Sequence, residues 1–194
     1  KYGMQVQSVL KKASKLDIKT ICPLHGPILR ENLEHYIGKY DIWSKYETES
    51  EGVYIACASL HGNTLKVCEK LKEILEEKGA SKVVLADLSR EDWAEAVEDS
   101  FRYGKIVFAS ATYDMGIFTP MRDLLLNLKE KNYQNKKVAI IENGTWAPNA
   151  ARCMKEIIST MKNVEIVEPI VTIKSTLKQE NIEKLNELAE NLLK

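Results

Sequence analysis

Net charge, long apolar runs and paired-cysteine motifs are all missing from this 194-residue sequence. Its 28 lysine and arginine residues balance 28 aspartate and glutamate residues, which argues against nucleic acid or an anionic membrane as the main partner. The apolar runs have the length of strands, so none is expected to span a bilayer, and no signal-peptide pattern occurs. The four cysteines show no C-x-x-C spacing, which favours reduced thiols in a cytoplasmic protein.

Two common nucleotide-binding motifs are also absent. No Gly-x-Gly-x-x-Gly occurs, and no loop ends in Gly-Lys-Ser or Gly-Lys-Thr, so neither a dinucleotide fingerprint nor a P-loop is present. Residues 52–78 instead combine a buried apolar strand (53–58), a small polar loop (59–64) and an amphipathic helix. Because a helix N-terminus carries free N–H groups, this loop can receive an anion. The alternative is that its side chains only cap the helix.

From residue 52 onward, strand and helix patterns alternate strictly. This alternation predicts an α/β fold with a doubly wound, five-stranded parallel sheet, and short right-handed crossovers favour the flavodoxin-like order 2-1-3-4-5. The expected strands are 53–58, 82–87, 105–110, 137–142 and 164–167. The expected helices are 63–78, 91–100, 119–130, 148–161 and 179–193.

The first 50 residues have a different, mainly helical character. Two amphipathic helices are expected at 4–16 and 29–46, with a very short strand candidate at 20–22 between them. One strand cannot form a sheet by itself, and 48–51 reads as a polar linker. The sequence does not begin with methionine either. We therefore expect residues 1–50 to be the tail of a preceding domain, followed by a second domain at 51–194.

Polar loops follow three of the predicted strands. They lie at 59–64, 110–116 and 143–148, and they are rich in glycine, hydroxyl and amide groups. The carboxyl ends of parallel strands share one sheet edge, and ligands bind there beside the point where strand order reverses. Two of the loops also carry a large aromatic residue, Tyr113 or Trp146. The sequence thus predicts a site for a flat, partly polar ligand with a phosphate tail.

These motifs resemble those of known families. SLHGNT, SATYDMGIF and ENGTWAP, all within 52–194, resemble the three FMN-binding loops of flavodoxins. Upstream, ICPLHGPI followed by a long helix resembles the flavodiiron proteins, whose metallo-β-lactamase-like di-iron domain precedes an FMN domain. The resemblance implies that FMN delivers electrons to a di-iron site that reduces oxygen or nitric oxide. It also implies a rubredoxin-like or other small redox donor and a head-to-tail homodimer of the intact protein.

The resemblance also assigns residues. His25 would be an iron ligand, with the other ligands, and hence the di-iron centre, belonging only to the intact parent protein. The FMN contacts would come from Ser59, Leu60, His61, Gly62, Asn63, Thr64, Ala111, Thr112, Tyr113, Asp114, Met115, Gly116, Asn143, Gly144, Thr145, Trp146 and Ala147.

Simpler interpretations stand beside these assignments. Tyr113 and Trp146 are expected against the flavin ring, but both can be ordinary loop residues. His25 can equally be a loop histidine, since a metal site needs several convergent ligands. The chain can also be a stand-alone, non-catalytic flavodoxin-like carrier. An NAD(P)H:quinone reductase of related fold is a third possibility, for which no nicotinamide-specific signal is present.

Overall fold

A computed structural model describes all 194 residues, which form two compact units, 1–49 and 50–194. None of the helices combines the length and the apolar character needed to cross a membrane.

The first unit is a pair of helices with almost no core. Helices α1 (Gly3–Ala13) and α2 (Leu33–Lys45) pack together where Gly3 closely approaches the backbone of Ser44. Gln7 joins them further, because its Nε2 donates to Asp41 Oδ1 and to Ser44 Oγ, both at 2.8 Å. No hydrophobic side chain of this unit is buried, and Tyr40 and Trp43 each expose about half of their surface.

Three expectations for this part of the chain need correction. The strand candidate at 20–22 forms only one isolated bridge, between Ile21 and Leu29. The second helix begins at Leu33 rather than at residue 29, because Asn32 has a left-handed backbone with φ 52°. The polar linker is also shorter than expected, since strand β1 already begins at Ser50.

The second unit is built on a parallel sheet in the order β2-β1-β3-β5-β6. These strands are β1 (Ser50–Ala58), β2 (Val83–Asp87), β3 (Tyr103–Tyr113), β5 (Gln134–Asn143) and β6 (Lys162–Ile173). A two-residue strand, β4 (Gly116–Ile117), pairs only with the end of β3, antiparallel to it. Counting the parallel strands alone, the order is 2-1-3-4-5, so the predicted fold and topology are confirmed.

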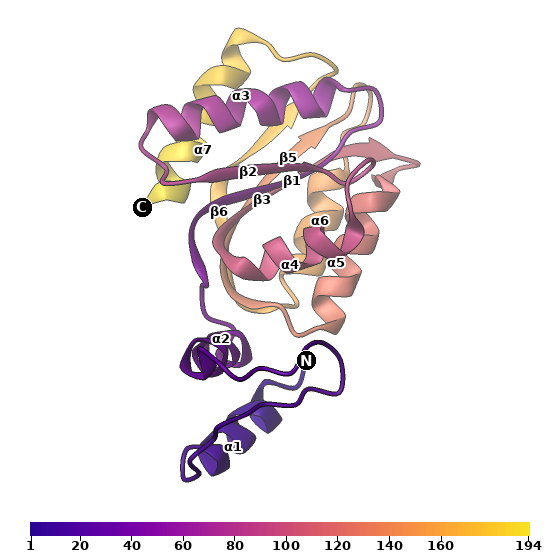
Figure 1. Ribbon diagram of the computed structural model, residues 1–194. Coiled ribbons are helices and arrows are strands. Elements are labelled where there is room, and N and C mark those ends of the chain that lie inside the picture. Colours follow the sequence, from indigo (N-terminus) through magenta and orange to yellow (C-terminus); the bar gives the residue numbers. More distant parts are fainter. The chain divides into compact units, whose positions relative to one another are not determined.

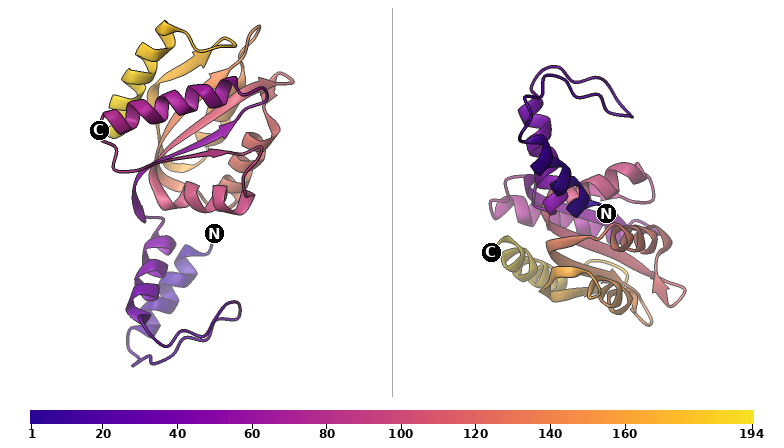
Figure 2. Two further views of the ribbon diagram at one scale, coloured as in Figure 1. Left: turned by 45° about the horizontal axis from the view of Figure 1, so that its top comes forward. Right: turned by 90° about the horizontal axis from the view of Figure 1, so that it is seen from below.

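Helices cover both faces of this sheet (Figures 1 and 2). On one face lie α3 (Asn63–Glu77) and α7 (Gln179–Leu193). On the other lie α4 (Trp93–Arg102), α5 (Thr119–Glu130) and α6 (Ala150–Ile158). Alternate residues of β1 belong to the two hydrophobic cores on either side of the sheet. Those that pack on the α3 side are Val53, Ile55 and Cys57, and those on the opposite side are Tyr54, Ala56 and Ala58. Burial on both faces explains why the central strands read as continuous apolar runs.

The last strand differs most from its prediction. It was expected at 164–167 and instead extends to Ile173, with a register shift opposite Ala139 and Ile141. Pro169 lies inside that irregular stretch, where an edge strand tolerates a missing N–H donor. The longer β6 carries the chain as far along the sheet edge as the end of β5, because Ile173 pairs with Asn143.

Candidate functional site

All three polar loops meet at one pocket beside the carboxyl ends of the strands. The pocket has a volume of about 170 Å³ and is lined by Leu60, His61, Asn63, Thr64, Ala111, Thr112, Asn143, Gly144, Thr145 and Ser175. The first nine come from the three predicted loops, after β1, β3 and β5. Ser175 comes from a fourth segment, between β6 and α7, which was not predicted. Sites for drug-sized ligands occupy roughly 300 Å³ or more, so this pocket can hold the narrow part of such a ligand and not a whole ring system.

The first loop leaves the N-terminus of α3 open. Gly62 is the N-cap residue, with φ 84°, and no side chain caps the helix. The alternative interpretation, in which Ser59, Asn63 or Thr64 serves only as a helix cap, is therefore not what the structure shows. No acidic residue lies in the first turn of α3. Free N–H groups and the positive end of the helix dipole thus face the loop without a competing side chain.

The hydroxyl of Ser59 is a second feature of this loop that indicates a ligand-binding site. Its hydroxyl oxygen is buried and forms no hydrogen bond in the protein. A buried hydroxyl without a partner costs free energy, so such groups commonly mark a place where a ligand or water binds. By contrast, helix α4 is capped within the protein, since Asp92 Oδ1 accepts from Ala94 N at 2.7 Å. The start of α3 thus differs from that of α4, although α5 also begins without a side-chain cap.

Below the loop lies a pair of buried thiols. Cys57 and Cys68, on β1 and α3, are both fully buried in one core cluster. A hydrogen bond with Cys57 and burial raise the pKa of Cys68 well above its ordinary value. The Cys68 thiol therefore stays protonated, and both cysteines form part of the packing beneath the loop, in the core positions that the sequence predicted.

The second loop is a tight hairpin. Asp114 and Met115 have φ of 49° and 58° and form the turn between β3 and β4, where Tyr113 pairs with Gly116. Positive φ at both central residues is typical of a type I′ turn. The ring of Tyr113 contacts that of Phe118, with centroids 5.7 Å apart, and about half of Tyr113 is exposed. Of the predicted residues here, only Ala111 and Thr112 line the pocket.

The third loop is anchored from two strands. On β3, Thr112 Oγ1 accepts from Asn149 N at 3.0 Å and from Ala150 N at 3.2 Å. On β5, the buried Glu142 accepts from Ala151 N at 2.9 Å. Side chains of neighbouring strands thus satisfy the N-terminus of α6. That helix end is occupied by the protein, in contrast to the end of α3.

Gly144 lies where this anchored loop passes closest to β3. A Cβ atom at this position would lie 2.9 Å from Thr112 Oγ1 and 2.9 Å from Pro148 Cα. Beyond it, Trp146 is 96% exposed and contacts no core. The large aromatic residue is therefore presented at the rim of the site rather than used for packing.

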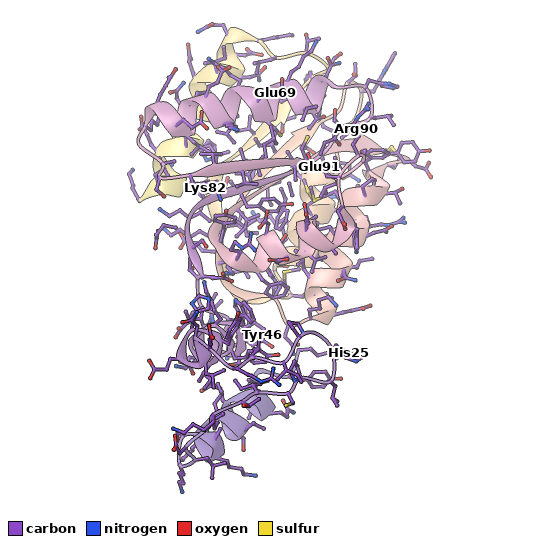
Figure 3. All side chains as sticks on the ribbon, viewed as in Figure 1. His25, Tyr46, Glu69, Lys82, Arg90 and Glu91 are labelled. Atoms are coloured by element: carbon purple, nitrogen blue, oxygen red, sulfur yellow. The ribbon has the colours of Figure 1, made fainter.

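The charged groups of the loop after β2 bond mainly within that loop. Its buried Asp87 accepts from Ser89 N at 3.0 Å and pairs with Arg90 at 3.3 Å, while Glu91 accepts from Asp87 N at 3.0 Å. Figure 3 labels Arg90 and Glu91 in this loop. The charged groups there bond to one another, and no residue of this loop lines the pocket.

The sequence predicted nine of the ten residues that line the pocket; it missed Ser175, and it also missed Glu142, which anchors α6. Ser175 was missed because the last strand was expected to end at residue 167, which left Ser175 away from the sheet edge. Glu142 was missed because it sits inside an apolar run, where its role as an anchor depends on α6. Ser59, Gly62, Tyr113, Asp114, Met115, Gly116, Trp146 and Ala147 lie next to the pocket in the chain without lining it. His25 lies in the other unit, exposed on the segment between α1 and α2 (Figure 3).

Comparison with known proteins gives relatives of about twice this length. No protein-family model matches the chain. It is 26% identical over 181 residues to a nitric oxide reductase of Moorella thermoacetica, covering 91% of this chain and 44% of that protein. It is 24% identical over 195 residues to an uncharacterised protein of Methanocaldococcus jannaschii, covering 98% of this chain and 48% of that one. The chain thus spans about half the length of the curated relatives it matches.

Solved structures agree on the fold. The rubredoxin:oxygen oxidoreductase of Desulfovibrio gigas matches 98% of this chain with 48% of its own, at 20% identity and a TM-score of 0.89. A flavo di-iron protein of Thermotoga maritima matches 99% of this chain with 48% of its own, at 25% identity and a TM-score of 0.82. Flavodoxin 2 of Bacillus cereus matches 73% of this chain with 97% of its own, at 24% identity and a TM-score of 0.63. The match therefore extends through both compact units in the longer proteins and through a complete flavodoxin in the shorter one.

Proposed function

We propose, on the premise that this chain matches the flavodoxin-like half of flavodiiron proteins over nearly all its length, that it is the FMN-binding, electron-transfer part of an oxidoreductase. The observation that carries this proposal is the open N-terminus of α3 beside the unpartnered Ser59 hydroxyl. Both features suit a dianionic phosphate: Asn63 and Thr64 at the start of α3 line the pocket where the loops meet, and Ser59 precedes them in the same loop. Bound FMN supplies reversible electron-carrying chemistry, while the protein binds and orients it and limits access of water.

The residues in and beside the pocket divide between two parts of the cofactor. Ser59, Asn63 and Thr64, with the N–H groups that begin α3, would hold the phosphate. Gly144 and Thr145 would line the path of the chain that links phosphate and ring, since both border the pocket. The ring would lie beyond the pocket at the open rim, where Tyr113 and Trp146 are exposed. A neutral net charge is compatible with this assignment, because helix N–H groups bind phosphate without a lysine.

A binding experiment tests the phosphate assignment. The purified chain should bind one FMN, and not FAD, because the site offers one phosphate cradle and no adenosine pocket. Changing Asn63 and Thr64 together to alanine should weaken FMN binding by a few kcal/mol, since hydrogen bonds to charged groups contribute about 1.5–3 kcal/mol each. Quenching of flavin fluorescence measures the affinity. Glu69→Gln, an exposed change on the same helix (Figure 3), is the matched control. Equal affinity of the double variant and wild type would refute the assignment.

The di-iron part of the proposal concerns the longer protein. In it, electrons from a small rubredoxin-like donor would pass through the flavin domain to a di-iron site that reduces oxygen, nitric oxide or both. His25 would be one iron ligand there. Within the 194 residues, no group of three or more histidine, cysteine, aspartate or glutamate side chains could hold a metal ion. The lack of buried apolar side chains in 1–49 supports the view that this unit is the tail of a larger domain.

The dimer is proposed on the same basis. A helix of 13 residues spans about 20 Å at 1.5 Å per residue, and α2 separates His25 from the flavin domain along the chain. We propose that each flavin serves the iron of the other chain in a head-to-tail homodimer. Mixing a full-length His25→Ala variant with a full-length variant that cannot bind FMN should restore activity in mixed dimers. If verified mixed dimers stay inactive, electrons flow within one chain.

The second candidate is a stand-alone electron carrier, and the match to a complete flavodoxin favours it. The two candidates differ in what His25 does. In the flavodiiron protein, His25→Ala in the full-length chain should lower the iron content and abolish oxygen and nitric oxide reduction, with FMN binding unchanged. In a carrier, the same change should leave metal content and electron transfer to an external acceptor as they were.

A further inference from the structure

The segment between β6 and α7 presents one residue in an unusual conformation at the pocket. Ser175 has φ 69°, a left-handed value that is uncommon for a residue other than glycine. Thr176 N donates to Lys174 O at 3.1 Å, which closes a three-residue turn with Ser175 at its tip. Turns of this kind with positive φ at the tip are rare and strained. Such strain persists only where the surroundings hold it.

Asn143, at the end of β5, fixes the backbone of Ser175 in this conformation. Its Nδ2 donates to Ser175 O at 2.9 Å, and its Oδ1 accepts from Ser175 N at 3.0 Å. One buried amide side chain thus satisfies both backbone polar groups of Ser175. The hydroxyl is the one polar group of Ser175 that Asn143 does not bind. The amide of Asn143 is therefore used within the protein, while the residue itself still lines the pocket.

The turn lies on the same side of the pocket as the open helix end. Ser175 lines the pocket together with Asn63 and Thr64. The helix that follows it, α7, packs against α3 on one face of the sheet. Figures 1 and 2 show the segment before α7 running beside the N-terminal end of α3. A group bound at the start of α3 is therefore within reach of the turn.

From this geometry we infer that Ser175 is a further ligand-binding residue, whose hydroxyl donates a hydrogen bond to the phosphate of the bound mononucleotide. This inference rests on the proposed FMN site and adds to it a fourth segment of the chain that contacts the ligand. The phosphate loop itself contains no lysine or arginine. A dianionic phosphate has many acceptor positions, so an additional hydroxyl donor from a separate strand end contributes directly to its affinity. Asn143 is then a positioning residue, because it acts on the ligand through Ser175.

The test compares FMN with riboflavin, which has the same ring and sugar chain without the phosphate. Ser175→Gly removes the hydroxyl and suits the left-handed backbone, so the variant is expected to fold. Ser175→Ala removes the hydroxyl and keeps the Cβ atom. Both variants should bind FMN at least about tenfold more weakly than the wild type, as the loss of a hydrogen bond to a charged group predicts. Their affinity for riboflavin should stay within twofold of the wild-type value.

Thr176→Ala is the matched control, since Thr176 is exposed beside the turn and does not line the pocket. It should leave both affinities unchanged. Wild-type FMN affinity in both Ser175 variants would overturn the inference. Equal losses for FMN and riboflavin would also overturn it, because the hydroxyl would then contact the sugar chain or the ring. If the wild-type chain binds neither flavin, the proposed function itself fails, which is a different result from a wild type that binds FMN and is insensitive to Ser175.

Discussion

Replacing Thr112 with valine should destabilise the flavodoxin-like unit measurably, although the two side chains have nearly the same shape. The hydroxyl oxygen of Thr112 accepts two backbone N–H groups at the start of α6, from Asn149 at 3.0 Å and from Ala150 at 3.2 Å. Valine fills the same space and cannot accept either bond. The two N–H groups would then have no intrahelical partner, because they belong to the first turn of the helix.

The magnitude follows from the two bonds. A typical hydrogen bond within a protein contributes about 1 kcal/mol net, and the loss of a helix cap costs about 0.5–2 kcal/mol. The site is half-buried, so water replaces part of the loss. We expect the free energy of unfolding to fall by about 2 kcal/mol. In a protein of this size, such a change lowers the melting temperature by about 4–8 °C.

Urea denaturation followed by circular dichroism measures this change. Thr112→Ser is the matched control, because it keeps the hydroxyl and loses only a methyl group. It should retain most of the stability that Thr112→Val loses. If the valine variant unfolds within about 0.5 kcal/mol of the wild type, a change typical of ordinary surface substitutions, Thr112 does not anchor α6 and the account of the third loop is wrong.

Three further changes test other parts of the structure. Burial lowers the pKa of Lys136 to about 8; because the unfolded chain keeps this proton to about pH 10.4, the free energy of unfolding should rise between pH 8 and 10. Lys136→Met should flatten that rise in urea titrations at each pH, and an unchanged slope would contradict the assignment. Phe108→Ala, at a fully buried position of β3, should cost about 3–5 kcal/mol, and a loss below 1 kcal/mol by the same titration would contradict the described packing. Asp92→Ala should cost about 1 kcal/mol, since the carboxylate caps α4 at Ala94 N; Asp92→Asn should keep most of the cap, and equal losses in both would argue against it.

The sequence by itself determined the architecture of residues 50–194. Apolar runs such as 53–58 and 105–110 are long enough for strands and too short for helices, and amphipathic segments separate them. One helix, 119–130, was predicted to the residue, because Pro120 suits a helix start and an apolar stripe runs through to Leu128. Once strands and helices alternate, handedness and short connections leave few arrangements of the sheet. The shared edge of the three loops then follows from topology alone.

Only the tertiary structure decided what each side chain in those loops does. Asn63 and Asn143 are the same residue type in similar polar loops, yet the first lies at an open helix end and the second is committed to Ser175. Thr64 and Thr112 differ in the same way, since Thr112 is used to anchor α6. No local pattern distinguishes these roles, because a hydrogen bond between residues 32 or 37 positions apart depends on strand register and helix placement. Ser175 reaches the site for the same reason: β6 continues past its irregular stretch at Pro169 until it ends level with β5.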